Sequence, residues 1–372
     1  MKIESSPTEE LAWVALAGLR LPLHPQHLLE CLGSPLALFQ NLQTASTLLR
    51  LTDLQKDRIE KLRWSDVARQ LEQALMADCR FISYLEDAYP ARLKQLPRPP
   101  AGLWVRGMPE ALSLPLVAVV GARQASPYGL HVARDLSRGL VKAGLGIISG
   151  GALGIDAAAH RAALEAEGRS IAVFGTGILQ DYPPQHRGLF QELCHHGCCV
   201  SELAPLAPVR PEHFPIRNRI ISGLSLGVVV VEAGERSGSL ITVRYALEQD
   251  REVFAVPGPI SSPLSVGPHR LIKQGAKLVT SAEDILEELR LQLPLPLKRS
   301  TCEPEPTPPL EGTALSVWER LRHGAQSLEQ LSQGHDESLH ELFERLLELE
   351  LGGWIQQIPG GRYERCKTRT FR

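Results

Sequence analysis

Residues 116–127 read LVAVVGARQASP, which is a short apolar run followed by a glycine-containing turn and by a serine and a proline that suit the first turn of a helix. The run at 116–120 shows no alternation of apolar and polar residues. Such a run is typical of a strand that is covered on both faces, as in a parallel sheet. The stretch therefore predicts a strand–turn–helix unit.

The same pattern recurs along the middle of the chain. Further apolar runs lie at 146–149, 171–174, 199–201, 227–231 and 252–256, and amphipathic helical segments separate them. Short strands that alternate with helices predict an α/β fold with a Rossmann-like, doubly wound and mostly parallel sheet. We assign this domain to residues 81–290.

The flanking regions differ in composition. Residues 1–80 predict a small helical domain, because leucine and valine recur there at helical spacings. Residues 291–312 (LQLPLPLKRSTCEPEPTPPLEG) are rich in proline and predict an exposed linker. Residues 313–372 predict three helices and a β-hairpin, with Ser327 as the N-cap of the second helix and Gln330 three residues later. This order is that of a winged-helix domain.

Composition limits the class of protein. The chain has 372 residues and a net charge of -2, so any binding of an anionic ligand must come from local clustering of charge. The beginning, MKIESSPTEE, lacks the apolar core of a secretion signal, and no apolar run is long enough to span a membrane. Seven cysteines, an odd number, argue against a disulfide framework. We therefore expect a cytoplasmic protein.

Three turns that follow predicted strands have residues suited to binding anions. In a parallel sheet, ligands bind beyond the carboxyl ends of the strands, where backbone N–H groups at helix starts attract phosphate. The candidate residues are Arg123 in the first turn, Ser149, Gly150 and Gly151 in the second, and Arg236, Ser237, Gly238 and Ser239 in the turn after 227–231. Successive phosphates of one nucleic-acid strand would satisfy all three turns. A solvated loop arginine at 123, or a turn that serves packing alone, is the alternative.

A fourth candidate segment opens the helix before the strand at 227–231. Here Phe214 precedes Arg217, Asn218 and Arg219. An aromatic side chain next to cations is the combination that single-strand binders use for base stacking and phosphate contact. The alternative is that the two arginines satisfy backbone carbonyls or the nearby Glu202.

Other ligand classes have weaker signals. The sequence Gly175-Thr176-Gly177 lacks the third glycine of a dinucleotide loop, and no Walker lysine motif is present. The cluster CHHGCC at 194–199 contains zinc-type ligands, but no second ligand cluster accompanies it. We expect neither a metal nor a cofactor.

Several ordered motifs closely resemble the DNA-processing protein A family (DprA/Smf) of bacterial natural transformation. They are VAVVGAR at 117–123, SGGALGIDAAAH at 149–160, FPIRNRIISGLS at 214–225, VVVVEAGERSGSLIT at 228–242, REVFAVPGPI at 251–260, AYPARLKQLPRPPAGLWVRG at 88–107 and LIKQGA at 271–276. The resemblance covers residues 80–290 densely. The flanking regions are similar in type to a sterile-alpha-motif-like module and a winged helix.

The resemblance implies a protein that binds single-stranded DNA, protects incoming strands, passes them to the RecA recombinase and performs no catalysis. It places the DNA pocket on Arg123, Gly150, Gly151, Phe214, Arg217, Arg219, Ser237, Gly238 and Ser239. It also implies a homodimer with a surface at residues 268–275, including His269, Leu271, Ile272 and Gly275, with the RecA contact close by. Two departures are that His269-Arg270 precedes Leu271-Ile272 where the family often has asparagine, and that Gly18-Leu19-Arg20-Leu21 replaces a Gly-x-Gly hairpin.

Two other functions are compatible with parts of the sequence. Phosphoribohydrolases of the lysine-decarboxylase-like type have similar pockets, but their signature Gly-Gly-x-Gly-Thr-x-x-Glu has no glutamate counterpart at residues 238–242. A transcription regulator would use the winged helix, yet its third helix carries one arginine, Arg345, against the acidic residues Glu337, Glu341, Glu344, Glu348 and Glu350. We therefore predict that the winged helix makes protein contacts, or binds DNA only through the basic tail at 362–372.

Overall fold

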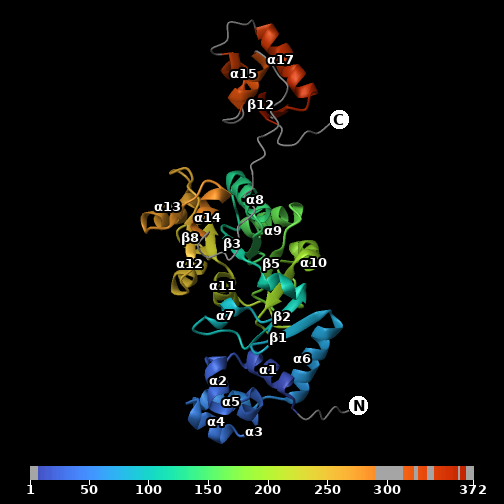
Figure 1. Ribbon diagram of the computed structural model, residues 1–372, viewed down its shortest axis with the longest axis vertical. Coiled ribbons are helices and arrows are strands. Elements are labelled where there is room, and N and C mark those ends of the chain that lie inside the picture. The colour runs from blue at the N-terminus through green and yellow to red at the C-terminus, as the bar shows by residue number, and fades with distance from the viewer. Residues whose placement is uncertain (1–6, 290–312, 322–325, 333–338, 359–360, 366–372) are drawn as a thin grey trace. The chain divides into compact units, whose positions relative to one another are not determined.

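The computed structural model describes residues 7–289, 313–321, 326–332, 339–358 and 361–365. Contacts between residues divide the chain into two compact units, residues 1–300 and 301–372 (Figure 1). The predicted linker at 291–312, the residue Glu337 and the end of the basic tail lie outside the described residues. In the described part of the chain, every helix is too short or too polar to cross a membrane.

The first unit begins with six helices, as the leucine spacing predicts. They are α1 (Glu9–Leu19), α2 (Pro25–Leu32), α3 (Pro35–Gln40), α4 (Leu42–Leu48), α5 (Asp53–Glu60) and α6 (Trp64–Met76). Gly33 ends α2 with a φ of 75°, which glycine adopts without steric cost, and the Ser34 side chain then accepts from Ala37 N to begin α3. The buried residues of these helices join the same apolar core as one face of the sheet.

A nine-stranded sheet follows, and its parallel part confirms the predicted fold class. The strand order is β1-β2-β6-β5-β4-β3-β7-β8-β9, and all pairs from β6 to β9 are parallel. The strands of this part are β3 (Leu116–Val120), β4 (Gly146–Ser149), β5 (Ser170–Val173), β6 (Cys198–Ser201), β7 (Gly227–Val230), β8 (Glu252–Ala255) and β9 (Lys277–Leu278).

Two antiparallel strands at the other edge were not predicted. They are β1 (Cys79–Ser83) and β2 (Gly102–Gly107), with the short helix α7 (Ala91–Lys94) between them. Phe81 and Trp104 are paired across these strands, with ring centroids 4.8 Å apart. A proline-rich connection at 97–100 lies directly before β2 and interrupts the hydrophobic pattern. The alternation of residues that marks a strand is therefore not visible in this part of the sequence.

Helices cover both faces of the sheet (Figure 1). On one face, Val117 and Val119 of β3 belong to the core formed with α8 (Pro127–Lys142), α9 (Ile155–Glu165) and α14 (Ala282–Leu289). On the other, Ala118 and Val120 belong to the core that includes residues of the remaining helices, α10 (Arg187–His196), α11 (His213–Leu224), α12 (Ser239–Glu248) and α13 (Val266–Lys273). Residues alternate between faces along each strand, so a fully apolar strand is required.

The described residues of the second unit form three helices and a small sheet of order β10-β12-β11. Its elements are α15 (Thr313–Arg320), β10 (Gln326–Ser327), α16 (Leu328–Ser332), α17 (Leu339–Leu351), β11 (Ile355–Ile358) and β12 (Arg362–Arg365). The predicted cap of α16 is present, because Gln330 N donates to Ser327 Oγ at 3.3 Å and Ser327 N donates to Gln330 Oε1 at 2.9 Å. This is the winged-helix order that the sequence indicates.

The broad apolar stripe of α17 divides into a buried and an exposed part. Leu342, Leu346 and Leu349 are buried in the core of the second unit. Phe343 and Leu347 are 49% and 48% exposed, on a helix whose acidic residues Glu341, Glu344 and Glu348 are also exposed. The helix therefore presents both apolar and acidic side chains to solvent.

Replacing Leu140 with alanine should lower the free energy of unfolding of the first unit by roughly 2–5 kcal/mol. Leu140 lies on α8 and is completely buried against the sheet, so its removal leaves a cavity. Chemical denaturation followed by circular dichroism measures the change. Leu75→Ala on α6, where the leucine is 56% exposed, is the matched control and should change stability by less than about 0.5 kcal/mol. Equal losses for both variants would contradict this packing.

Candidate nucleic-acid interface

A cavity of about 480 Å³ opens beyond the carboxyl ends of the central parallel strands. The turns after β3, β4 and β7 and the first residues of α11 form its walls. Eight of the predicted residues line it, namely Arg123, Gly150, Phe214, Arg217, Asn218, Ser237, Gly238 and Ser239. The fold thus brings together segments that are more than a hundred residues apart in the sequence.

One wall of the cavity is aromatic. The ring of Phe214 lies 5.6 Å from that of Tyr182, centroid to centroid, and the guanidinium carbon of Arg123 lies 5.9 Å from the Phe214 centroid. Arg123 is exposed and forms no ion pair within residues 7–289. A cation over an aromatic face in an open cavity can hold a phosphate while the ring contacts a base.

Tyr182 is a site residue that the sequence analysis missed. It lies in the loop that begins with Gly175-Thr176-Gly177, which lacks the third glycine of a dinucleotide loop. Gly175 instead leaves room for Phe214, because a Cβ at position 175 would lie 2.7 Å from the Phe214 ring. An aromatic residue in a loop at the carboxyl edge of the sheet was the signal available in the sequence.

Arg217 forms its hydrogen bonds with other groups of the chain. It is buried, its guanidinium donates to Gly150 O at 2.9 Å and to Val173 O, and its Nε donates to Asn218 Oδ1 at 3.2 Å. Burial lowers the pKa of Arg217 to about 10, although the nearby carboxylate of Asp156 opposes this shift. The contacts of Arg217 therefore match the alternative hypothesis, in which this arginine satisfies backbone carbonyls. Its side chain also lines the cavity.

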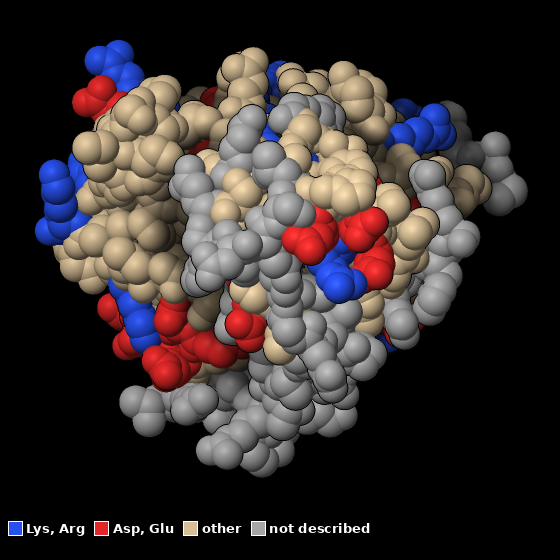
Figure 2. Space-filling model, turned by 90° about the horizontal axis from the view of Figure 1, so that it is seen from above, with Lys and Arg blue, Asp and Glu red and all other residues tan. Residues whose placement is uncertain are grey.

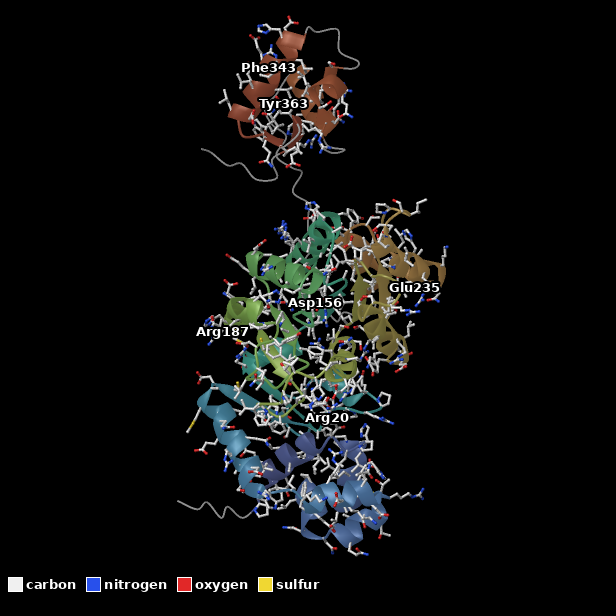
Figure 3. All side chains as sticks on the ribbon, turned by 180° about the vertical axis from the view of Figure 1, so that it is seen from behind. Arg20, Asp156, Arg187, Glu235, Phe343 and Tyr363 are labelled. Atoms are coloured by element: carbon white, nitrogen blue, oxygen red, sulfur yellow. The ribbon has the colours of Figure 1, made fainter. Side chains whose placement is uncertain are left out.

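The second glycine-rich turn holds a carboxylate of the protein. Asp156 is buried and accepts from Gly150 N at 3.1 Å and Ala152 N at 3.2 Å, and Figure 3 shows it in the middle of the first unit. Burial raises the pKa of Asp156, while Arg217 and these amides act in the opposite direction. A Cβ at Gly150 would lie 2.7 Å from Arg217 Nη2 and 2.9 Å from Asp156 Oδ2, so glycine is needed for this close approach.

The neighbouring predicted residues also have internal partners. Ser149 Oγ donates to Val119 O at 2.6 Å. Gly151 is buried, and its carbonyl oxygen lies 3.0 Å from Nδ1 of His186. Neither residue lines the cavity.

A carboxylate of the chain also lies at the start of α8, the helix that follows the first turn. Glu232 is buried at the end of β7, and it accepts from Ser126 N at 2.9 Å and from Ser126 Oγ. The helix dipole favours this negative charge. Two of the three predicted anion-binding turns therefore already contain a carboxylate of the chain.

Among the described residues, no carboxylate is hydrogen-bonded at the start of α12. Its N-cap residue, Gly238, has no side chain to cap the helix, while Ser237 Oγ accepts from Ser239 N at 3.4 Å and lies 2.8 Å from Ser239 Oγ. Gly238 is exposed, with free space around the position that a Cβ would take. The helix N-terminus and two hydroxyls thus face the cavity and can receive an external anion. Arg236 is exposed and does not line the cavity.

Arg219 lies on the opposite side of α11 from Arg217. Residues two apart on a helix do not share a face. Arg219 donates to the carboxylate of Glu202 and to Arg98 O at 3.0 Å, and it lines a different cavity. The structure therefore does not bring Arg219 together with the other predicted site residues.

The residues predicted for a dimer surface lie on α13 and the turn after it. Leu271 is buried in the core of its own chain, while Ile272 is half-buried and Gly275 is exposed. His269 Nε2 lies 3.0 Å from Gly258 O, so this side chain ties α13 to the loop after β8. His269, Ile272 and Gly275 are the members of this set with exposed surface.

The cysteine cluster lies away from the cavity. Cys198 and Cys199 are buried in β6, and Cys199 Sγ lies 3.9 Å from Cys194 Sγ on α10. Within the described ranges, no group of three or more His, Cys, Asp or Glu side chains is arranged to hold a metal ion.

Charged side chains are mixed over the visible surface. On the face shown in Figure 2, basic and acidic residues are interspersed, and the described residues form no continuous basic area there. A net charge of -2 gives no overall attraction for an anionic ligand, so affinity must come from a few locally placed groups.

Comparison with known proteins identifies relatives over most of the chain. The sequence profile of the family described as DNA recombination-mediator protein A matches residues 80–290, and that of the DprA winged helix domain matches residues 302–361. Protein Smf of Escherichia coli is 45% identical over 280 residues, which are 73% of this chain and 74% of that protein. DNA processing protein DprA of Bacillus subtilis is 46% identical over 202 residues, or 54% of this chain and 68% of that protein.

Two solved structures are similar in fold. The X-ray structure of DNA processing protein A from Streptococcus pneumoniae has a TM-score of 0.66 and 35% identity, covering 76% of this chain and 98% of that one. A structure of DNA processing protein A from Helicobacter pylori, described for its single-stranded DNA binding mode, has a TM-score of 0.52 and 27% identity, covering 57% and 96%.

Replacing Asp156 with alanine should lower the free energy of unfolding by about 2–5 kcal/mol, because two backbone amides lose their acceptor and the buried Arg217 loses a nearby opposite charge. The double variant Asp156→Ala/Arg217→Met should lose less than the sum of the two single variants, as measured by denaturation. Asp135→Ala on α8, where the carboxylate is exposed, is the control and should cost about 1 kcal/mol or less. Strict additivity would show that the two charges do not interact.

Proposed function

Because this chain belongs to the DNA recombination-mediator protein A family, we propose that it binds single-stranded DNA in the cavity beyond β3, β4 and β7. In this proposal it protects incoming strands during natural transformation and recombination and loads the RecA recombinase onto them. The observation that carries the proposal is the combination, in one cavity, of the Phe214 and Tyr182 rings, the exposed Arg123 and the uncapped start of α12. The single-stranded DNA binding mode described for the related protein of Helicobacter pylori supports it.

Each part of the cavity would contact a different part of the strand. A base would stack against Phe214 or Tyr182, and the flanking phosphates would contact Arg123, the Gly238 amide and the hydroxyls of Ser237 and Ser239. The bases of a duplex are stacked inside the helix and cannot reach these rings. The cavity therefore favours single strands over duplex DNA.

We propose that the protein acts by binding and not by catalysis. Asp156, which lines the cavity, and Glu232, at the start of α8, are both hydrogen-bonded to backbone amides of the chain, which suits a structural role. The alternative of a nucleotide hydrolase needs an acidic residue near the start of α12, where this chain has Ser239, Leu240, Ile241 and Thr242.

The proposed partners are a second copy of the chain and the RecA recombinase. A homodimer would use the exposed part of the 268–275 segment, and RecA would bind nearby. The acidic and apolar surface of α17 suits a protein partner better than DNA, because Glu341, Glu344 and Glu348 would repel phosphates. We place this activity in the cytoplasm.

Arg123→Ala should weaken binding of a labelled single strand of about 30 nucleotides by about ten- to a hundredfold, since one charge-assisted phosphate contact is lost. The slope of log K against log salt should fall by about 0.7. Fluorescence anisotropy at several salt concentrations measures both, with the corresponding duplex as a second ligand. Arg161→Ala on α9, another exposed arginine, is the control. An unchanged affinity for Arg123→Ala would mean that the pocket is misassigned.

Phe214→Ala should weaken single-strand binding by about 1–3 kcal/mol without changing the salt slope, because stacking involves no counterion release. Tyr182→Ala should act in the same direction. The same anisotropy titration measures the effect. Phe343→Ala on α17, another half-exposed aromatic, is the matched control and should leave affinity unchanged. A change of salt slope for Phe214→Ala would indicate a phosphate-binding disturbance and contradict the stacking assignment.

A further inference from the structure

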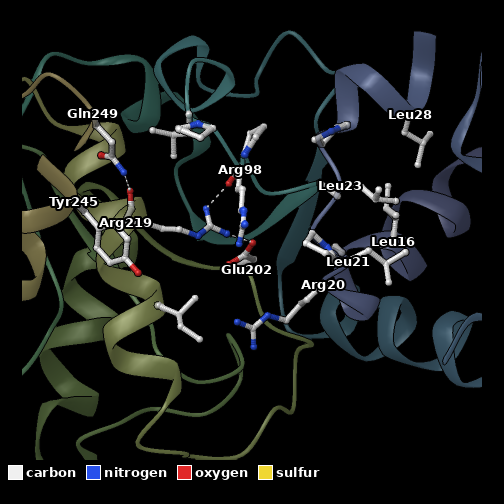
Figure 4. Close-up of a pocket in the computed structure, with 18 of the residues that line it drawn as sticks. Leu16, Arg20, Leu21, Leu23, Leu28, Arg98, Glu202, Arg219, Tyr245 and Gln249 are labelled. Carbon is white, nitrogen blue, oxygen red and sulfur yellow. Dashed lines mark hydrogen bonds and ion pairs between the residues drawn. The ribbon is translucent and has the colours of Figure 1, made fainter. Parts of the chain in front are cut away.

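A second cavity of about 480 Å³ lies between the N-terminal helices and the sheet. Its apolar side comes from α1, α2 and the residues that join them, and its other side comes from α11, α12 and the proline-rich connection before β2 (Figure 4). Leu16, Leu21, Leu23 and Leu28 face Tyr245, Arg219 and Gln249 across this space. Arg20 is at the junction between the two regions, as Figure 3 also shows.

This cavity has positive charge that the chain does not neutralise. Arg219 is paired with Glu202, and Glu248 is paired with Arg244 at 3.7 Å. Arg20 and Arg98 also line the cavity, and within residues 7–289 neither forms an ion pair. Two guanidinium groups are therefore available to an anionic ligand.

The second cavity is adjacent to the first along α11. Phe214 and Arg217 face the first cavity, whereas Ile216 and Arg219 on the same helix face the second. The loop between β6 and α11 also contributes to both, with Glu202 in the second cavity and Val209 in the first. The first residues of α11 thus lie between the two cavities.

Both signs of charge lie near the start of α11. Burial, together with the positive charges of Arg20 and Arg210, lowers the pKa of His213, the first residue of α11, while Glu212 acts in the opposite direction. Arg20 lines the second cavity together with Ile216 and Arg219 of this helix.

Apolar side chains are also exposed in the two cavities. Val209, which lines the first cavity, and Ile216, which lines the second, are 44% and 37% exposed. Exposed apolar side chains next to arginines offer flat contacts for bases and charges for phosphates. An acidic peptide would also meet the two arginines, but the continuity with the first cavity favours nucleic acid.

We propose that the second cavity continues the path of the single strand, which leaves the Phe214 pocket, crosses the start of α11 and places further phosphates against Arg20 and Arg98. The N-terminal helices would then form part of the DNA-binding surface. This inference rests on the proposed function, because it assumes that a strand occupies the first cavity. It predicts that the N-terminal helices matter only for strands long enough to reach them.

The test compares the double variant Arg20→Gln/Arg98→Gln with the unchanged full-length chain on oligonucleotides of about 6 and about 20 nucleotides. The matched control is Arg50→Gln/Arg63→Gln, in the same N-terminal helical region but outside both cavities. Arg50 has a left-handed φ of 51°, close to the 47° of Arg20, so the control changes a residue of similar backbone conformation. Arg98→Gln alone serves as a second variant, because its side chain is exposed and its loss should not disturb folding.

The double variant should bind the longer strand about tenfold more weakly, with a salt slope lower by about 1.4 for two lost phosphate contacts, and the shorter strand equally well. The control should match the unchanged chain. Equal affinity of the double variant and the unchanged chain for the longer strand would overturn this inference, as would an equal loss on both lengths. If the double variant instead loses binding only to an acidic apolar peptide, the cavity is a protein-docking site and the inference fails.

Arg123→Ala on the same two oligonucleotides separates this inference from the proposed function. If Arg123→Ala weakens binding of both oligonucleotides and the double variant has no length-dependent effect, the second cavity is not a DNA subsite and the first pocket still stands. If Arg123→Ala changes the affinity for neither oligonucleotide, both the first pocket and its continuation are ruled out.

Discussion

The backbone contacts of two buried charges, Asp156 and Arg217, are the interactions on which the cavity depends. Asp156 accepts from the amides of Gly150 and Ala152 in the turn after β4, and Arg217 donates to the carbonyls of Gly150 and Val173, so the two side chains join β4, α9, β5 and α11. The two opposite charges also favour one another, because a buried ion without hydrogen-bond partners or a nearby opposite charge carries a desolvation penalty of several kcal/mol. These contacts position the beginning of α11, which carries Phe214.

Internal carboxylates also decide which groups face a ligand. Asp156 and Glu232 occupy the starts of α9 and α8, where a phosphate would otherwise be attracted. What remains for an external anion is Arg123 and the uncapped start of α12. A protein with a net charge of -2 can in this way present a locally positive cavity, because the negative charges near it are already hydrogen-bonded.

The N-terminal helices and the sheet belong to one packed unit. Residues of α1 share an apolar core with strands of the antiparallel edge and with one face of the parallel sheet. The contact leaves a second cavity lined by both regions, with Arg20 and Arg98 free of acidic partners in the described part of the chain. Packing of the helical region thus extends the surface that the parallel sheet alone could offer to a ligand.

Local periodicity, caps and turn residues were enough to predict the parallel part of the sheet, the helical N-terminal region and the winged-helix order, and they also located the turns that line the cavity. Which of these groups are free to meet a ligand became visible only in the folded chain. Arg217 and the Gly150 amide have internal partners, Arg219 is paired with Glu202, and Tyr182 joins Phe214 from a distant loop. A residue type states which contacts a side chain can make, whereas its actual partner depends on burial and on groups that folding brings from elsewhere in the chain.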